Sequence, residues 1–224
     1  MKADYTHISI ILDRTGSMEN IRDDTIGGFN TFLKDQKSQA DIATLTLVQF
    51  DTYNPYEVIH KFESIQEIPE LTRETFVPRA GTPLLDAIGR GINDLEQSLS
   101  QMKESQRPLK IVFLIITDGQ ENSSREFRKE QIAKMIQQKQ EQDKWQFVFL
   151  SADLNAINDA QEYGISRKSS MAFDKNVVGT ASAWLSSSER ISDYRKSADL
   201  RDIEFTKEDR AKQATEQKRK KPKS

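Results

Sequence analysis

Oxygen-bearing side chains gather in residues 13–17, where Asp13, Thr15 and Ser17 occupy alternate positions. This segment follows the largely apolar run 8–12 and precedes a helix that is expected to begin near Asn20. In open α/β sheets, ligands bind beyond the carboxyl ends of the strands, which is where these side chains would lie. Carboxylate and hydroxyl oxygens, with no cysteine or histidine near them, suit a hard cation such as magnesium.

Two further segments bring oxygen donors toward the same edge of the predicted sheet. Thr82 precedes a helix that is expected to begin at Pro83, because proline suits the first helical turn. The apolar run 111–116 predicts a central parallel strand, and it leads directly to Asp118. With residues 13–17, these segments supply two carboxylates and three hydroxyls. Magnesium takes about six oxygen ligands and usually keeps some water, so this set would leave a coordination position free.

The remaining patterns predict the sheet that holds these segments. Further strands are expected near 42–50, 56–62, 145–150 and 169–173, with helices near 20–37, 83–102, 125–142, 154–163 and 177–194. The turn between the first two of these strands is too short for a parallel crossover, so they should be antiparallel, with 56–62 at an edge. The order predicts an α/β, three-layer, doubly wound, Rossmann-like fold that is mostly parallel with one antiparallel edge strand.

Composition favours one globular domain of ordinary size. The chain has 224 residues, of which 36% are hydrophobic and 30% charged. It contains no cysteine, which excludes disulfides, thiolate metal sites and cysteine nucleophiles. No apolar run approaches the roughly 20 residues that span a bilayer, so we expect no membrane segment. The amino terminus enters strand-like sequence without a leader, and a cytoplasmic protein is therefore expected.

Charge is unevenly distributed along the chain. From Lys207 onward there are eight basic and three acidic residues, and no large apolar residue follows Phe205. Such a segment is expected to be mobile, because it buries too little surface to offset its ordering entropy. We therefore predict a domain over 1–198 and a basic, disordered tail over 199–224. The basic run 218–221 indicates at most weak contact with nucleic acid or acidic partners.

The three oxygen-bearing segments together resemble the metal-ion-dependent adhesion site of von Willebrand factor type A domains. The likeness rests on Asp13-x-Thr15-x-Ser17, on Thr82 and on Asp118 within Ile-Thr-Asp-Gly. The order of elements extends it over about residues 5–194. The family pattern is Asp-x-Ser-x-Ser, so Thr15 is a departure that keeps the hydroxyl. The resemblance implies that the three hydroxyls bind the metal directly, and that the two aspartates act largely through water.

The resemblance also implies binding without catalysis. Neutral hydroxyl ligands leave the metal electrophilic, and partners of this family supply an aspartate or glutamate to it. We therefore expect an intracellular, prokaryotic-type adaptor or assembly module that uses magnesium, with manganese as an alternative, to bind a protein partner. The competing hypothesis is a magnesium-dependent phosphatase with Asp13 as nucleophile. Those enzymes place a second aspartate two residues later, where this chain has Thr15, and no matching lysine motif is present.

Four residues near these segments have two interpretations each. Arg14 either guides an acidic partner or is solvated. Asp86 either supports Thr82 from one helical turn away or favours the positive end of its helix. Glu121 and Asn122 either line the rim of the site or cap the helix that follows.

Overall fold

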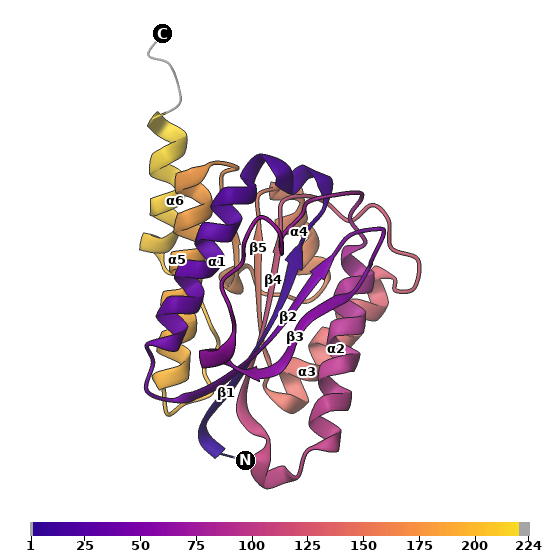
Figure 1. Ribbon diagram of the computed structural model, residues 1–224, viewed down its shortest axis with the longest axis vertical. Coiled ribbons are helices and arrows are strands. Elements are labelled where there is room, and N and C mark those ends of the chain that lie inside the picture. Colours follow the sequence, from indigo (N-terminus) through magenta and orange to yellow (C-terminus); the bar gives the residue numbers. More distant parts are fainter. Residues whose placement is uncertain (1, 220–224) are drawn as a thin grey trace.

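A computed structural model describes residues 2–219, which form a six-stranded sheet between two layers of helices (Figure 1). The strands are β1 (Lys2–Asp13), β2 (Ile42–Phe50), β3 (Glu57–Ser64), β4 (Pro108–Thr117), β5 (Gln146–Ser151) and β6 (Ser170–Ala172). Their order across the sheet is β3-β2-β1-β4-β5-β6. Each neighbouring pair is parallel except β2 and β3. The predicted mostly parallel sheet with one antiparallel edge strand is therefore confirmed.

The helices cover both faces of this sheet. They are α1 (Arg22–Lys37), α2 (Leu84–Gln101), α3 (Lys129–Asp143), α4 (Leu154–Glu162), α5 (Val177–Lys196) and α6 (Lys207–Arg219). One apolar core lies between the sheet and α1 with α5, and the other lies between the sheet and α2, α3 and α4 (Figure 1). Among the helices within residues 2–219, none has the length and apolar character needed to cross a membrane.

The central strands are continuously apolar because both of their faces are covered. On β4, Val112, Leu114 and Ile116 enter the core beneath α1 and α5. The alternating residues Phe113 and Ile115 enter the core on the opposite face. Complete burial of such a side chain contributes roughly 1.5–3 kcal/mol, so the centre of the sheet contributes strongly to the stability of the fold. The loops at its carboxyl end are held by this frame.

Two glycines in α1 have different surroundings. A Cβ atom on Gly28 would lie 2.1 Å from Cδ1 of Trp184, whereas a Cβ atom on Gly27 would meet no atom within 4 Å. Trp184 belongs to α5 and contacts Phe29 and Phe32 of α1. Gly28 therefore allows the two helices to pack closely, and Gly27 does not contribute to that contact.

We expect Gly28→Ala to lower the free energy of unfolding by about 1–3 kcal/mol, because the new methyl group displaces the packed Trp184 ring. Gly27→Ala is the matched control and should raise that free energy by up to about 1 kcal/mol, because alanine favours helix. Urea denaturation of both variants measures the two effects. Equal effects of the two substitutions would contradict this explanation of α1–α5 packing.

The predicted domain end at 198 and the mobile tail after it are wrong for the residues through Gln213. Ile203 and Phe205 are buried in the core shared by α1 and α5. In α6, Asp209 is buried and forms an ion pair with Arg190 at 3.3 Å, and Gln213 donates a hydrogen bond to the carbonyl oxygen of Gly179. Polar groups anchor this helix, so its lack of apolar residues does not prevent it from docking. Residues 220–224 of the predicted tail lie outside the described residues.

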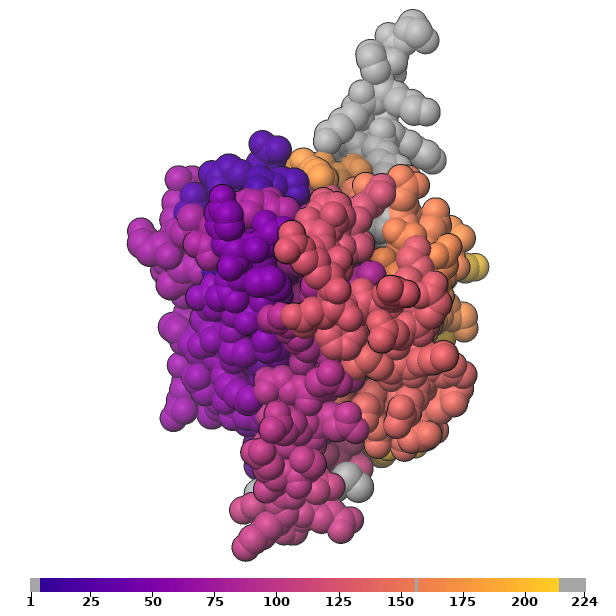
Figure 2. All heavy atoms as spheres, turned by 90° about the vertical axis from the view of Figure 1, so that its right-hand side faces the viewer, coloured from indigo at the N-terminus to yellow at the C-terminus, as the bar shows by residue number. Residues whose placement is uncertain are grey.

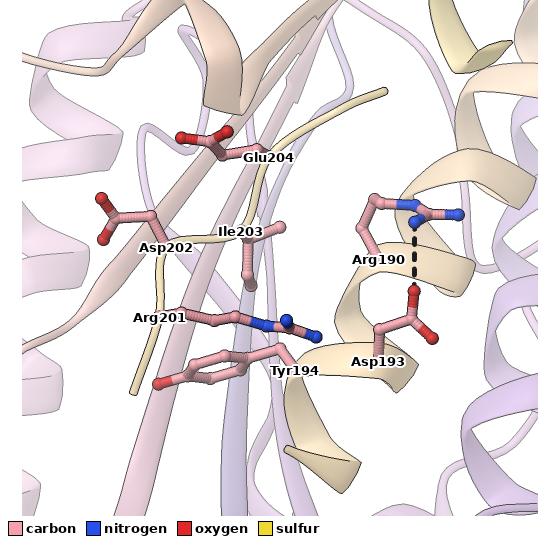
Figure 3. Close-up of a pocket in the computed structure, with 7 residues that line it drawn as sticks. All are labelled: Arg190, Asp193, Tyr194, Arg201, Asp202, Ile203 and Glu204. Atoms are coloured by element: carbon pink, nitrogen blue, oxygen red, sulfur yellow. Dashed lines mark ion pairs between the residues drawn. The ribbon is translucent and has the colours of Figure 1, made fainter. Parts of the chain in front are cut away.

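A charged cleft lies between α5 and the segment that leads to α6 (Figure 3). It is lined by Arg190, Asp193, Tyr194, Arg201, Asp202, Ile203 and Glu204. Arg190 and Asp193 form an ion pair at 3.1 Å across one side of it. None of the five residues predicted to bind a metal lines this cleft.

Candidate metal site

The two central strands deliver two of the predicted segments to one place. β1 and β4 are parallel neighbours, and their register pairs Leu12 with Ile116. The residues that follow, Asp13 on one strand and Thr117 and Asp118 on the other, therefore emerge together at the carboxyl end of the sheet. The chain then turns toward β2 from one strand and toward β5 from the other, which makes this a topological switch point.

Asp13 is fully buried at the end of β1, and both of its carboxylate oxygens accept hydrogen bonds. The backbone N–H of Thr15 donates to Oδ1 at 2.7 Å, and the hydroxyl of Thr117 donates to Oδ2 at 2.6 Å. Burial raises the pKa of Asp13 to about 6, and the nearby Asp118 carboxylate adds to the rise, against the lowering effect of these hydrogen bonds. A cation beside the two carboxylates would favour their ionised forms.

The hydroxyls of residues 13–17 connect the first segment to Asp118. Oγ1 of Thr15 lies 3.2 Å from Oγ of Ser17, and this Ser17 hydroxyl donates to Oδ1 of Asp118 at 2.5 Å. Thr15 and Asp118 are buried, while Ser17 is exposed. Asp13, Thr15, Ser17 and Asp118 therefore lie close together. They are four of the five predicted ligands, and Ser17 is the one that is exposed to solvent.

Thr82 is held beside the same two loops by its backbone. Its N–H donates to Oδ1 of Asn122 at 2.9 Å, and its carbonyl oxygen accepts from the N–H of Asn122 at 3.1 Å. The carbonyl oxygen of Ala80 accepts from the N–H of Gly16 at 3.0 Å, which joins this loop to the first one. Within the described residues, the Thr82 hydroxyl makes no hydrogen bond to the other four predicted ligands.

Arg14 is buried, so neither interpretation of it from the sequence is right. Its Nε and Nη2 atoms donate to Oδ2 of Asp51 at 3.0 and 2.7 Å, and Nη1 lies 2.6 Å from Oε2 of Glu57. Burial opposes ionisation of Asp51, but hydrogen bonds from the backbone, Arg14 and Arg79 outweigh it, so its pKa is lowered. Arg14 therefore anchors residues 13–17 to the end of β2 and does not face a partner.

Asp86, Glu121 and Asn122 fix the long loop after β4. The Asp86 carboxylate accepts hydrogen bonds from the backbone N–H groups of residues 125–127 at 2.8–2.9 Å. It therefore supports this loop and not Thr82, and it delays the start of α3 beyond the predicted residue 125. Glu121 accepts from the N–H of Leu85 at 2.9 Å. Glu121 and Asn122 thus tie this loop to the start of α2, and neither caps α3, whose N-cap is Arg128.

Sequence reasoning missed two residues that touch the candidate ligands. Thr117 precedes Asp118 directly, so its hydroxyl was detectable as part of the same motif. Lys175 lies between β6 and α5, and its Nζ atom is 3.2 Å from Oδ2 of Asp118. Only the sheet order brings Lys175 to this site, because no local pattern in the sequence marks it.

Comparisons with known proteins identify the fold. No family model matches the chain, and no curated protein matches it in sequence. Among solved structures, a von Willebrand factor type A protein from Catenulispora acidiphila aligns with 83% of this chain and 42% of its own, at a TM-score of 0.53 and 12% identity. This chain has a von Willebrand factor type A fold.

Two solved structures that contain a metal ion also share this fold. Proximal thread matrix protein 1 from the mussel byssus, with a zinc-occupied metal-ion-dependent adhesion site motif, matches 84% of this chain at a TM-score of 0.57 and 13% identity. The chain spans about half the length of that protein, 46%. Manganese-loaded TRAP protein from Plasmodium vivax matches 79% of this chain and 71% of its own, at a TM-score of 0.53 and 14% identity.

Proposed function

We propose that this protein is a protein-binding module that depends on a divalent cation. Magnesium is the proposed ion, and manganese is the alternative. The proposed ligands, directly or through water, are Asp13, Thr15, Ser17, Thr82 and Asp118. The observation that carries the proposal is the connected set of oxygen atoms that β1 and β4 bring together at the switch point of the sheet.

The donor chemistry of these residues fits such an ion. Magnesium binds oxygens at about 2.0–2.1 Å in an octahedron, so adjacent ligand oxygens lie about 3 Å apart. The Thr15 and Ser17 hydroxyl oxygens are separated by 3.2 Å, and Ser17 and Asp118 oxygens by 2.5 Å. Within residues 2–219, no group of three or more His, Cys, Asp or Glu side chains is placed to hold a metal. A metal in this part of the chain would therefore depend on hydroxyl ligands.

The expected partner is a protein that supplies an aspartate or glutamate. A bound magnesium ion would supply positive charge at the surface, of which neutral hydroxyl ligands cancel little. Three exposed apolar side chains also lie at this end of the sheet. They are Tyr53 after β2, Leu154 at the start of α4 and Val177 at the start of α5, which are 79%, 66% and 66% exposed.

The environment of Asp13 argues against the phosphatase alternative. Both carboxylate oxygens accept hydrogen bonds and the residue is completely buried, so neither oxygen faces a substrate. Thr15 also occupies the position where such enzymes carry a second aspartate. We therefore propose a non-enzymatic function and assign no catalytic residue. An intracellular adaptor or assembly role remains our prediction from the sequence, as does weak nucleic-acid contact through the basic end of the chain.

Partner capture in the presence and absence of metal tests the proposed function. We expect wild-type protein to retain specific proteins from a lysate in millimolar magnesium and to release them in EDTA. Ser17→Ala should lose the same proteins, because it removes a proposed ligand at the surface of the site. Ser100→Ala, at an exposed position of α2, is the matched control and should retain them. Equal retention by all samples would show that the metal is not the recognition element.

A further inference from the structure

A lysine outside the proposed ligand set reaches the buried carboxylate of Asp118. The Nζ atom of Lys175 lies 3.2 Å from Oδ2 of Asp118. The Asp118 side chain is completely buried, whereas the Lys175 side chain is 43% exposed, so the lysine approaches from the solvent side. Figure 2 shows the indigo residues that follow β1 and the orange residues that follow β6 at the same upper end of the molecule. β6 thus adds a third strand end to the site.

The two oxygens of Asp118 have different environments. Oδ1 accepts a hydrogen bond from Ser17, but Oδ2 is buried and accepts none from the residues that the structure describes. The Lys175 ammonium is close enough to form an ion pair with Oδ2, without the alignment of a hydrogen bond. A buried carboxylate oxygen without a donor is costly, and the charge of Lys175 offsets part of that cost. This contact is easily broken, because it lacks directional bonding.

The charge around Asp118 is only partly balanced. Asp13 and Asp118 are both buried, and Lys175 provides the one ion pair that either carboxylate forms within residues 2–219. A divalent cation would neutralise both carboxylates, whereas a single ammonium neutralises one. Lys175 and a divalent cation would therefore compete for the same carboxylate.

The backbone that carries Lys175 is held by neighbouring contacts, whereas its side chain is partly exposed to solvent. The N–H of Asn176 donates to the carbonyl oxygen of Asp174 at 2.7 Å, and the Asn176 side chain caps α5 by accepting from the N–H of Gly179 at 2.9 Å. Gly179 packs against Asp174 so closely that a Cβ atom there would lie 2.4 Å from its carbonyl oxygen. Lys175 can thus swing its side chain away without moving the segment.

We propose that Lys175 is an internal counter-ion of the metal site. It stabilises Asp118 when the metal is absent, and it leaves when a divalent cation binds. This inference rests on the proposed metal site. It implies that Lys175 lowers the affinity of the site for divalent cations and that metal binding releases its ammonium group to solvent.

Manganese affinity of the full chain, measured by titration calorimetry, tests the first consequence. Lys175→Met should bind Mn²⁺ about fivefold more tightly than wild type, the factor expected from losing one half-exposed ion pair. The measurement is made at physiological ionic strength, where the Debye length is about 8 Å, so that more distant charges have little influence while the contact itself is kept. Lys168→Met, which removes an exposed lysine paired with Glu204, is the matched control and should bind as wild type does. Lys175→Arg keeps the charge and should not bind more tightly than wild type.

Amine acetylation followed by mass spectrometry tests the second consequence without any partner. In the wild-type chain, Lys175 should react faster in Mn²⁺ than in EDTA, because the ion pair no longer shields its amine. The reaction of Lys168 should not change.

Lys175→Gln provides a second measurement of affinity if Lys175→Met is poorly folded.

The outcomes separate this inference from the proposed function. Tighter manganese binding by Lys175→Met, or binding by that variant alone, supports the counter-ion. Equal or weaker binding by the variant, with a wild-type chain that binds manganese, overturns the counter-ion and leaves the proposed function intact. Absence of binding by both chains overturns the metal site and the counter-ion together.

Discussion

Asp118→Ala is expected to abolish the stabilisation of this protein by magnesium. A ligand that binds only the folded state raises stability by RT ln(1 + [L]/Kd), or about 2.7 kcal/mol at a hundredfold excess over Kd. For a protein of this size, that corresponds to a rise in Tm of about 5–10 °C. Asp118 joins β4 to the Ser17 hydroxyl and carries the oxygen that has no hydrogen-bond donor. Its removal takes one of the two carboxylates from the site.

Thermal unfolding followed by circular dichroism, in magnesium and in EDTA, measures this effect. Asp153→Asn is the matched control, because Asp153 lies at the same end of the sheet and accepts a hydrogen bond from Gln120 at 3.1 Å. Asp153 also caps α4, and asparagine is an equally good cap. The control should keep the full response to magnesium. A rise in Tm for Asp118→Ala equal to that of wild type would contradict the proposed site.

Asp51→Ala is expected to lower the free energy of unfolding by about 3–5 kcal/mol, the usual cost of removing one partner from a buried ion pair. Asp51 is completely buried and accepts from Arg14, from Arg79 at 3.0 Å and from two backbone N–H groups. Its removal leaves the buried Arg14 guanidinium with only Glu57 as an acidic partner. Because Arg14 lies between Asp13 and Thr15, the response to magnesium should also weaken.

Urea denaturation measures this loss of stability. Asp23→Ala is the control, because Asp23 pairs with Arg73 on the surface, where the two side chains are 62% and 66% exposed. That substitution should cost at most about 1 kcal/mol. Adding Arg14→Met to Asp51→Ala should recover part of the loss, because the unpaired charge is removed. A small loss in Asp51→Ala would show that Arg14 does not depend on this carboxylate.

The two ion pairs at this end of the sheet should respond differently when a cation binds. The Arg14–Asp51 pair has two well-aligned hydrogen bonds and acts as a structural anchor for the loop. The Lys175–Asp118 pair has no aligned hydrogen bond and is partly exposed. The first pair should therefore persist in every state of the folded protein. The second is suited to exchange with a cation.

Patterns along the chain are enough to predict the sheet and to nominate the five candidate ligands. A strand covered on both faces must be apolar at every position, so residues 111–116 were recognisable as central without a structure. The short turn after β2 required an antiparallel neighbour. Oxygen donors at alternate residues after β1, and at Asp118 after β4, must converge when these strands are adjacent. Hydrophobic periodicity and turn length reveal such features because they depend on neighbours along the chain.

The roles of the polar residues around the candidate site depend on contacts that form only in the folded chain. Arg14 looks like an exposed loop residue until Asp51 and Glu57 are placed beside it. α6 has almost no apolar pattern, yet the buried side chains of Asp209 and Gln213 dock it on α5. Such contacts join segments that are far apart in the sequence. Each depends on a single pair of polar groups, so it produces no periodic pattern along the chain.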